Sequence, residues 1–312
     1  MTSYALRLHR WLALIFALPL AALIVTGFFL AFEPTVHLFH RAPGSLSAGQ
    51  VLDILKTHDP GGAARAITYR NYEGTLEIHT AMQGRPILVD VESRAAKTAP
   101  GTLAAALGIA RRIHVSLLYD LRPLVTTTTI ALLALIGLGL AMGLPRVSGT
   151  LSGWHKMTAW IGLPLLIASP LTGALMAFNV TMGGGGAAPM TMGAPAAKLT
   201  MIDVVQAAGA NRDLSNMVWI RTMWLRHMMR YMENGQFQGY FVTPKALVPV
   251  PRNWPRSIHE GLWIGSTGSV LNVVVSLMLA GLLTTGLLLW LRRQGRRGRR
   301  LQQDRSGLAA ST

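Results

Sequence analysis

The sequence predicts an α-helical membrane protein with four transmembrane helices, arranged as two parallel repeats, and with small α+β domains outside the membrane. Four stretches that lack Asp, Glu, Lys and Arg are long enough to cross a bilayer, which takes about 20 apolar residues. Lys and Arg gather on alternate connecting segments, and the two halves of the chain share one pattern of histidine, threonine and glycine. Only 13% of the residues are charged, against about 25% in soluble domains.

Cysteine is absent from the 312 residues. Disulfides, thiolate metal sites, iron–sulfur clusters, c-type haem attachment and cysteine nucleophiles are therefore excluded. The formal charge of +16 is compatible with a membrane surface or with nucleic acid, and the positions of the charges decide between them.

The apolar stretches cover residues 11–32, 123–145, 157–178 and 261–291. The first is too long for the apolar region of a signal peptide, and no cleavage pattern follows it, so we expect a retained anchor. The expected order is a first transmembrane helix, an outer domain, a second helix, an inner loop, a third helix, a second outer segment, a fourth helix and a basic tail. Their ranges are 1–33, 34–122, 123–145, 146–156, 157–178, 179–260, 261–291 and 292–312.

The basic residues predict the orientation. Segments 1–10, 146–156 and 292–312 together contain 11 Lys or Arg and one acid, Asp304, whereas both outer segments have a mixed charge. This asymmetry predicts a multi-pass membrane protein with both termini in the cytoplasm. The tail sequence RRQGRRGRR is then an anchor at anionic lipid headgroups, and nucleic acid is not expected as a partner.

An internal repeat relates the two halves. Thr26 lies 17 residues after His9, and Thr172 lies 17 residues after His155. Each threonine is followed by a glycine, Gly27 or Gly173. Each half also contains an Ile-His pair before its last span, at His114 and His259. Because each half crosses the membrane twice, the halves should be parallel repeats about an axis along the membrane normal.

The first outer segment has the pattern of a small α+β unit over residues 47–97. Ser47 and Gln50 form a capping box that predicts a helix near 48–57. Alternating apolar residues then predict three strands, around 67–69, 76–78 and 87–91, with His79 facing solvent.

The second outer segment has a less regular pattern. Thr200 and Asp203 form another capping box, but 182–197 is a low-complexity loop. Residues 217–232 are rich in methionine and include His227, a combination that could bind Cu(I). No regular spacing of the methionines supports that interpretation, so they are interpreted as adaptable packing residues.

Four of the nine histidines occupy matched places in the repeat: His9, His114, His155 and His259. Seventeen residues of helix rise about 26 Å, so one haem iron cannot join the two ends of a span. The expected pairs are therefore His9 with His155 at the inner end and His114 with His259 at the outer end. The other five, His37, His40, His58, His79 and His227, have ordinary structural interpretations, although His37 or His40 could replace an outer ligand.

Paired imidazoles on facing helices hold b-type haem without a covalent link. Two such pairs predict two haems b per chain and an electron path across the membrane, and each ring needs an acceptor that orients it. Small residues near these levels would let a macrocycle approach the backbone, although they serve helix packing equally well: Gly27, Gly173, Gly286, Gly137 and Gly139. Zinc fits less well, because two histidines leave it short of ligands, even if Asp120 or Glu260 completed an outer site.

The motifs LHRW, IHVSLL, WHK and IHEGLW, with the TG dipeptides, resemble the PepSY-associated transmembrane family, and 47–97 resembles a PepSY domain. The resemblance implies spans that carry periplasmic PepSY-like domains, of which the second, over 179–260, is degenerate here. Its best understood members are di-haem siderophore reductases of the bacterial inner membrane. It thus implies an oxidoreductase in which His9, His114, His155 and His259 hold two haems and a periplasmic ferric siderophore accepts electrons.

No nucleotide-binding extension follows the last span, so a quinol or a cytoplasmic reductase is the expected electron donor. Two other functions remain open from the sequence. One is a membrane-anchored module, without enzymatic activity, that binds peptides or regulates a protease. The other is a protein that handles copper or iron through its Met/His segment.

Overall fold

The computed structural model describes residues 2–39, 46–81, 84–144, 148–183, 199–223, 226–233 and 236–309. Two compact units make up the chain. A helical unit contains Met1–Leu30, Ala110–Asn179 and Leu271–Thr312, and an outer unit contains Ala31–Ile109 and Val180–Val270. The low-complexity loop lies almost entirely outside the described residues, as does His40.

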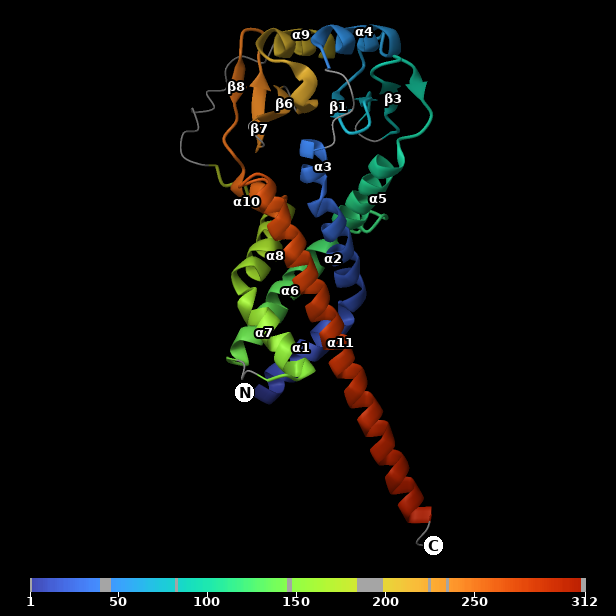
Figure 1. The fold of residues 1–312 in the computed structure, drawn as a ribbon, viewed down its shortest axis with the longest axis vertical. Coiled ribbons are helices and arrows are strands. Elements are labelled where there is room, and N and C mark those ends of the chain that lie inside the picture. The colour runs from blue at the N-terminus through green and yellow to red at the C-terminus, as the bar shows by residue number, and fades with distance from the viewer. Residues whose placement is uncertain are drawn as a thin grey trace. The chain divides into compact units, whose positions relative to one another are not determined.

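The helical unit contains the apolar helices (Figure 1). Its elements are α1 (Thr2–Ile15), α2 (Ala17–Ala31), α6 (Arg122–Ala141), α7 (Leu151–Ile161), α8 (Leu163–Ala177) and most of α11 (Ser266–Ala309). Three apolar helical stretches of the described chain are long enough to span a membrane by length and composition, namely Ala17–His37, Arg122–Ala141 and Ser266–Arg296. A span must be apolar because its side chains face lipid, and it must be helical because its backbone N–H and C=O groups have to be hydrogen-bonded within the span.

The expected third span is broken rather than straight. Helices α7 and α8 meet at an angle of 66°, so together they form either one broken span or a re-entrant segment. Gly162 ends α7, and Pro164 stands in the first turn of α8. Proline lacks the N–H that would continue the helix, and its ring clashes with the preceding turn. The sequence pattern showed the apolar length of 157–178 but not this bend.

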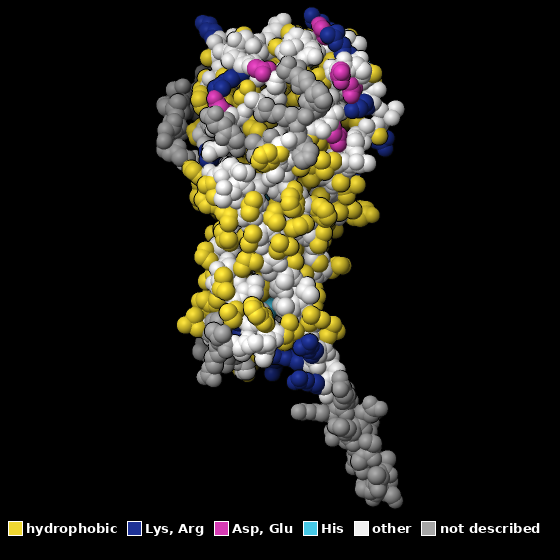
Figure 2. All heavy atoms as spheres, in the orientation of Figure 1, with side chains coloured by type: hydrophobic (Ala, Val, Ile, Leu, Met, Phe, Trp, Pro, Cys, Tyr) yellow, Lys and Arg dark blue, Asp and Glu magenta, His cyan; other side chains and the backbone are white. Residues whose placement is uncertain are grey.

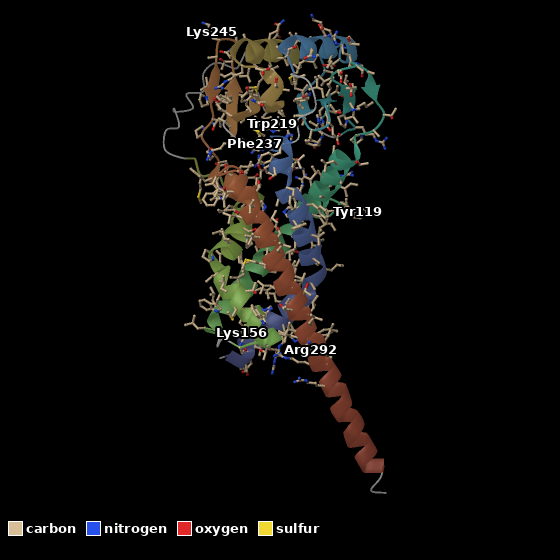
Figure 3. The ribbon with its side chains drawn as sticks, viewed as in Figure 1. Tyr119, Lys156, Trp219, Phe237, Lys245 and Arg292 are labelled. Atoms are coloured by element: carbon tan, nitrogen blue, oxygen red, sulfur yellow. The ribbon has the colours of Figure 1, made fainter. Side chains whose placement is uncertain are left out.

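The surface of the helical unit agrees with a membrane environment. Hydrophobic side chains cover most of the face shown in Figure 2, and Lys and Arg side chains gather at one end of the unit. Lys156 on α7 and Arg292 on α11 lie at that same end (Figure 3). Large apolar side chains are exposed along the helices, including Leu18 at 82% and Ile161 at 74%. Exposed apolar surface of this extent marks contact with lipid or with another protein.

The outer unit is built on one antiparallel sheet of eight strands in the order β4-β3-β2-β1-β5-β6-β7-β8. The first four strands are β1 (Ala66–Arg70), β2 (Thr75–His79), β3 (Ile87–Asp90) and β4 (Ala96–Lys97). The last four are β5 (Met217–Met223), β6 (Arg226–Glu233), β7 (Gln236–Val242) and β8 (Leu247–Pro249). Strand β1 pairs with β5, with Ile67 opposite Ile220, and joins the two outer segments into one sheet.

Two helices, α4 (Ala48–His58) and α9 (Met201–Asn211), cover one face of this sheet (Figure 1). Both begin with the expected capping boxes, at Ser47 and at Thr200. The helices approach closely at Gly209, where an added methyl group would clash with the Cβ atom of Ala48. The remaining helices of the outer unit are α3 (Glu33–Phe39), α10 (Trp254–His259), the start of α5 (Thr102–Ser116) and the single turn η1 (Leu214–Asn216).

The second outer segment is more regular than its sequence predicts. It contributes four strands and one helix that covers the sheet, as the first segment does. The alternation was obscured because methionine and arginine stand where β-branched residues usually stand in strands. Met217 and Met229 are buried at 1% and 0% exposure within the main core, so their interpretation as packing residues is confirmed. Met223 is 47% exposed and is not a core residue.

Candidate functional site

His155 on α7 is held by α11. Its Nδ1 lies 2.8 Å from Oγ1 of Thr285. The Thr285 hydroxyl donates its own hydrogen to the carbonyl oxygen of Gly281, at 2.6 Å, so its oxygen accepts from the imidazole. Nδ1 therefore carries the proton and Nε2 carries the lone pair. This is the tautomer that a metal ligand requires, and the acceptor behind the ring fixes its orientation.

His9 on α1 is held by α6 in the same sense. Its Nδ1 lies 3.2 Å from the carbonyl oxygen of Leu135. A carbonyl oxygen only accepts, so Nδ1 again donates and Nε2 bears the lone pair. Leu135 belongs to an apolar cluster that also includes Leu283 of α11.

His114 at the end of α5 has a cradle of the same kind on α2. Its Nδ1 lies 3.1 Å from both Oγ1 of Thr26 and the carbonyl oxygen of Leu23. The Thr26 hydroxyl donates to the carbonyl oxygen of Ala22 at 2.6 Å, so its oxygen is again an acceptor. The Nε2 atom of His114 is thus the nitrogen with the lone pair.

The glycine after each cradle threonine lies against the imidazole that the threonine holds. A methyl group at Gly27 would lie 3.2 Å from Cε1 of His114, and one at Gly286 would lie 3.6 Å from Cε1 of His155. Gly27 therefore leaves room for the His114 ring, whereas a methyl group at Gly286 would make only ordinary van der Waals contact with the His155 ring. The sequence predicts a different role for Gly27 and Gly286, namely that they let a macrocycle approach the backbone. A methyl group at Gly137 or Gly139 would meet no atom of the described chain within 4 Å.

Threonine is the functional residue type that the sequence-based reasoning missed. Thr26 and Thr172 served there only to define the repeat spacing, and Thr285 was left unassigned. The available signal was the recurrence of the dipeptide Thr-Gly in three apolar helices. Thr172 on α8 has the same internal bonds as the other two, with its hydroxyl 2.6 Å from the carbonyl oxygen of Ala168.

A family model described as the PepSY-associated TM region matches residues 6–293. The chain belongs to this family. The match covers nearly all of the chain, so this PepSY-associated TM protein is a multi-pass membrane protein whose extramembrane part is an antiparallel sheet domain. All four repeat-matched histidines and the Thr-Gly dipeptides at Thr26, Thr172 and Thr285 lie inside the matched range. No curated protein matches the chain by sequence.

His259, the fourth matched histidine of this PepSY-associated TM protein, ends α10 in the outer unit. The acids considered as zinc ligands are both engaged by arginine. Glu260 lies 2.9 Å from Arg230, and Asp120 lies 2.9 Å from Arg122. Within the described ranges, no three His, Asp or Glu side chains gather where they could hold one metal ion.

Two of the remaining histidines are buried in the outer unit. His37 of α3 contacts Asn71, with Nδ1 2.8 Å from Oδ1, and its ring packs edge-on against Tyr72. His227 of β6 lies 3.0 Å from Oγ1 of Thr222. Burial lowers the pKa of the His227 imidazole below its ordinary value, although the Asp203 carboxylate acts in the opposite direction.

Two further histidines have the ordinary surface roles expected of them. Nε2 of His58 lies 3.0 Å from the carbonyl oxygen of Arg94. His79 is partly exposed and lies 3.6 Å from Glu77. Neither has a geometry that indicates a cofactor site.

Proposed function

We propose that this protein is a transmembrane electron carrier that holds two haems b and reduces an acceptor outside the membrane, in the manner of a ferric-siderophore reductase. The observation that carries the proposal is the hydrogen bonding of the two inner histidines, which fixes their tautomer. His9 and His155 come from different helices, and each has Nδ1 fixed by an acceptor so that Nε2 bears the lone pair.

The donor set favours haem over a bare metal ion. Two imidazoles give a zinc ion only half of its usual four ligands. A porphyrin supplies four ligands of its own, so two axial imidazoles complete its iron. Bound haem would supply a one-electron couple at each end of the path, while the protein would fix the ligands and adjust their basicity.

The proposal of an outer pair of ligands rests on the sequence repeat and on the hydrogen bonds that hold His114. Thr26 and Leu23 prepare the His114 imidazole in the same way that α11 prepares His155. We propose His259 as its partner ligand, because Ile258–His259 repeats the pair Ile113–His114. We further propose that the two halves of the chain are parallel repeats, which agrees with four strands and one helix that covers the sheet from each outer segment.

The basic end of the helical unit supports the proposed orientation. Lys156 and Arg292 mark this end, and basic residues are retained on the cytoplasmic side of the inner membrane. His9 and His155 are each followed directly by a basic residue of the kind that marks this end. Electrons would therefore enter at the proposed inner haem from a quinol or a cytoplasmic reductase. The outer unit, on the periplasmic side, would hold the acceptor.

Haem content tests the proposal directly. Protein purified from haem-replete cells is assayed by the pyridine haemochrome method, and the expected result is two haems b per chain. His155→Ala should remove one of them and leave the other with an unchanged reduced spectrum. A colourless wild-type preparation would refute the proposal. Retention of biological activity by a variant with all four matched histidines changed to alanine would instead favour a PepSY module that binds peptides.

A further inference from the structure

The face of the sheet opposite α4 and α9 has a distinct chemistry in its second half. Side chains alternate along a strand, so the neighbours of the buried residues Ile220 and Met229 point to this other face. These neighbours, together with Arg226 beside the buried His227 and Phe241 opposite Met228, form what we call the basic–aromatic face: Trp219, Arg221, Arg226, Met228, Arg230 and Phe241. Trp219 of β5 and Phe237 of β7 lie on the side of the strands away from the two helices (Figure 3).

The strand register brings these residues together. Trp219 is directly opposite Arg230, and Met228 lies between Arg221 and Phe241 on the neighbouring strands. Guanidinium groups stack on the rings, with the Arg221 carbon 4.7 Å from the Trp219 ring centre and the Arg226 carbon 5.4 Å from that of Phe241. Stacking fixes the plane of each guanidinium while its N–H groups remain directed outward.

The arginines of this face differ in their surroundings. Arg226 forms no ion pair within the described part of the chain, whereas Arg230 pairs with Glu260. Arg221 is exposed. The first half of the sheet differs, since Arg70 there forms a two-point pair with Glu77. Burial raises the pKa of Glu77, but hydrogen bonds from His79 and Arg70 outweigh it and lower that pKa, so the carboxylate stays charged.

We propose that the basic–aromatic face binds an anionic chelate with planar aromatic donor groups, of the tris-catecholate class, as the acceptor of the electrons. This inference rests on the proposed function and names its substrate class. Guanidinium groups bind anionic oxygens in a two-point geometry, and the rings of Trp219 and Phe241 stack on flat aromatic groups. Met228 adds an adaptable, polarisable surface between them. A neutral hydroxamate chelate offers neither the charge nor the rings.

Binding is tested with gallium(III) complexes, because gallium(III) mimics iron(III) but is not reduced. The full-length protein in nanodiscs is titrated calorimetrically with trianionic gallium tris-catecholate and with neutral gallium tris-hydroxamate. The expected result is tighter binding of the catecholate complex, and weaker binding as salt is added. Arg221→Gln and Arg226→Gln should each weaken this binding roughly tenfold, as the loss of one hydrogen bond to a charged group does.

Lys245→Gln is the matched control. It removes the same charge from the turn between β7 and β8, at the far end of the same half of the sheet (Figure 3). This control should bind the catecholate complex as the wild type does. The inference is overturned if the two complexes bind equally, or if a variant with both Arg221→Gln and Arg226→Gln binds the catecholate complex as the wild type does. Tighter binding of an acidic peptide than of the catecholate complex would also overturn it.

Haem content measured on the same samples separates the two proposals. Protein that contains both haems but does not bind gallium tris-catecholate would refute the substrate class and leave the electron carrier intact. Protein that binds the complex through Arg221 and Arg226 but contains no haem would refute the electron carrier and leave the binding face intact.

Discussion

Replacing Thr285 by valine tests whether the acceptor behind His155 prepares this imidazole for iron. Valine has nearly the shape of threonine but cannot accept a hydrogen bond, so the 2.8 Å bond from Nδ1 is lost. A buried donor left without an acceptor costs about 1–3 kcal/mol. Removal of a group that orients a metal ligand typically lowers affinity about 10–100-fold. We therefore expect Thr285→Val to weaken binding of the inner haem by about that factor.

The assay is haem titration of the apoprotein, followed by low-temperature electron paramagnetic resonance and redox titration. A less basic axial imidazole stabilises iron(II) relative to an imidazole with a strong acceptor, so the midpoint potential of the inner haem should rise. Thr285→Ser keeps the acceptor and should restore both values. Thr284→Val makes the same chemical change on the exposed neighbouring position and should have no effect.

The reasoning is refuted if Thr285→Val binds inner haem as tightly as the wild type, with the same resonance and potential. In that case Nδ1 would not be the donor inferred from the Thr285–Gly281 bond. A loss of haem in Thr284→Val as well would show a general effect on α11 and would equally contradict a role specific to Thr285.

Three further predictions follow from the described geometry. Gly27→Ala should crowd His114, because the new methyl group would lie 3.2 Å from Cε1, whereas Gly286→Ala at 3.6 Å from His155 should leave the haem spectra unchanged. Gly209→Ala should destabilise the outer unit by about 1–3 kcal/mol, as overpacking does, and hydrogen exchange of α4 and α9 checks this. Because burial lowers the pKa of His227, the unfolded chain binds a proton first as pH falls below about 6.5. The stability of the outer unit should therefore decline below that pH. The protection of β6 amides from hydrogen exchange should decline with it, and His227→Gln should reduce this loss of protection.

The elements with local signals were predicted well. The capping boxes at Ser47 and Thr200 use residues three apart, and the helices begin there as expected. Strands β1, β2 and β3 follow the predicted alternation around Ile67, Leu76 and Val89. Uninterrupted apolar length likewise indicated the membrane helices, since few soluble structures need it. These features depend on neighbours along the chain, and for that reason the sequence alone contains them.

Features that depend on packing were predicted less well. A proline after a glycine inside an apolar run can kink a helix or end it, and the length of residues 157–178 favoured a straight span. Strands β5 to β8 were missed because Met217, Arg230 and Met232 have no strong preference for strands. The conformation of these strands is imposed by the pairing of β5 with β1 and by the burial of Met217 and Met229 against α9.

The ligand environment illustrates the same limit at the site itself. The acceptors of His9, His155 and His114 lie 126, 130 and 88 residues away in the sequence, each on a different helix. No local pattern can connect positions so far apart, although the repeat spacing alone singles out these histidines among the nine. The tautomer of each ring is thus a property of the assembled bundle. A substitution that displaces α6 or α11 should therefore change the orientation of His9 or His155 even when every histidine is kept.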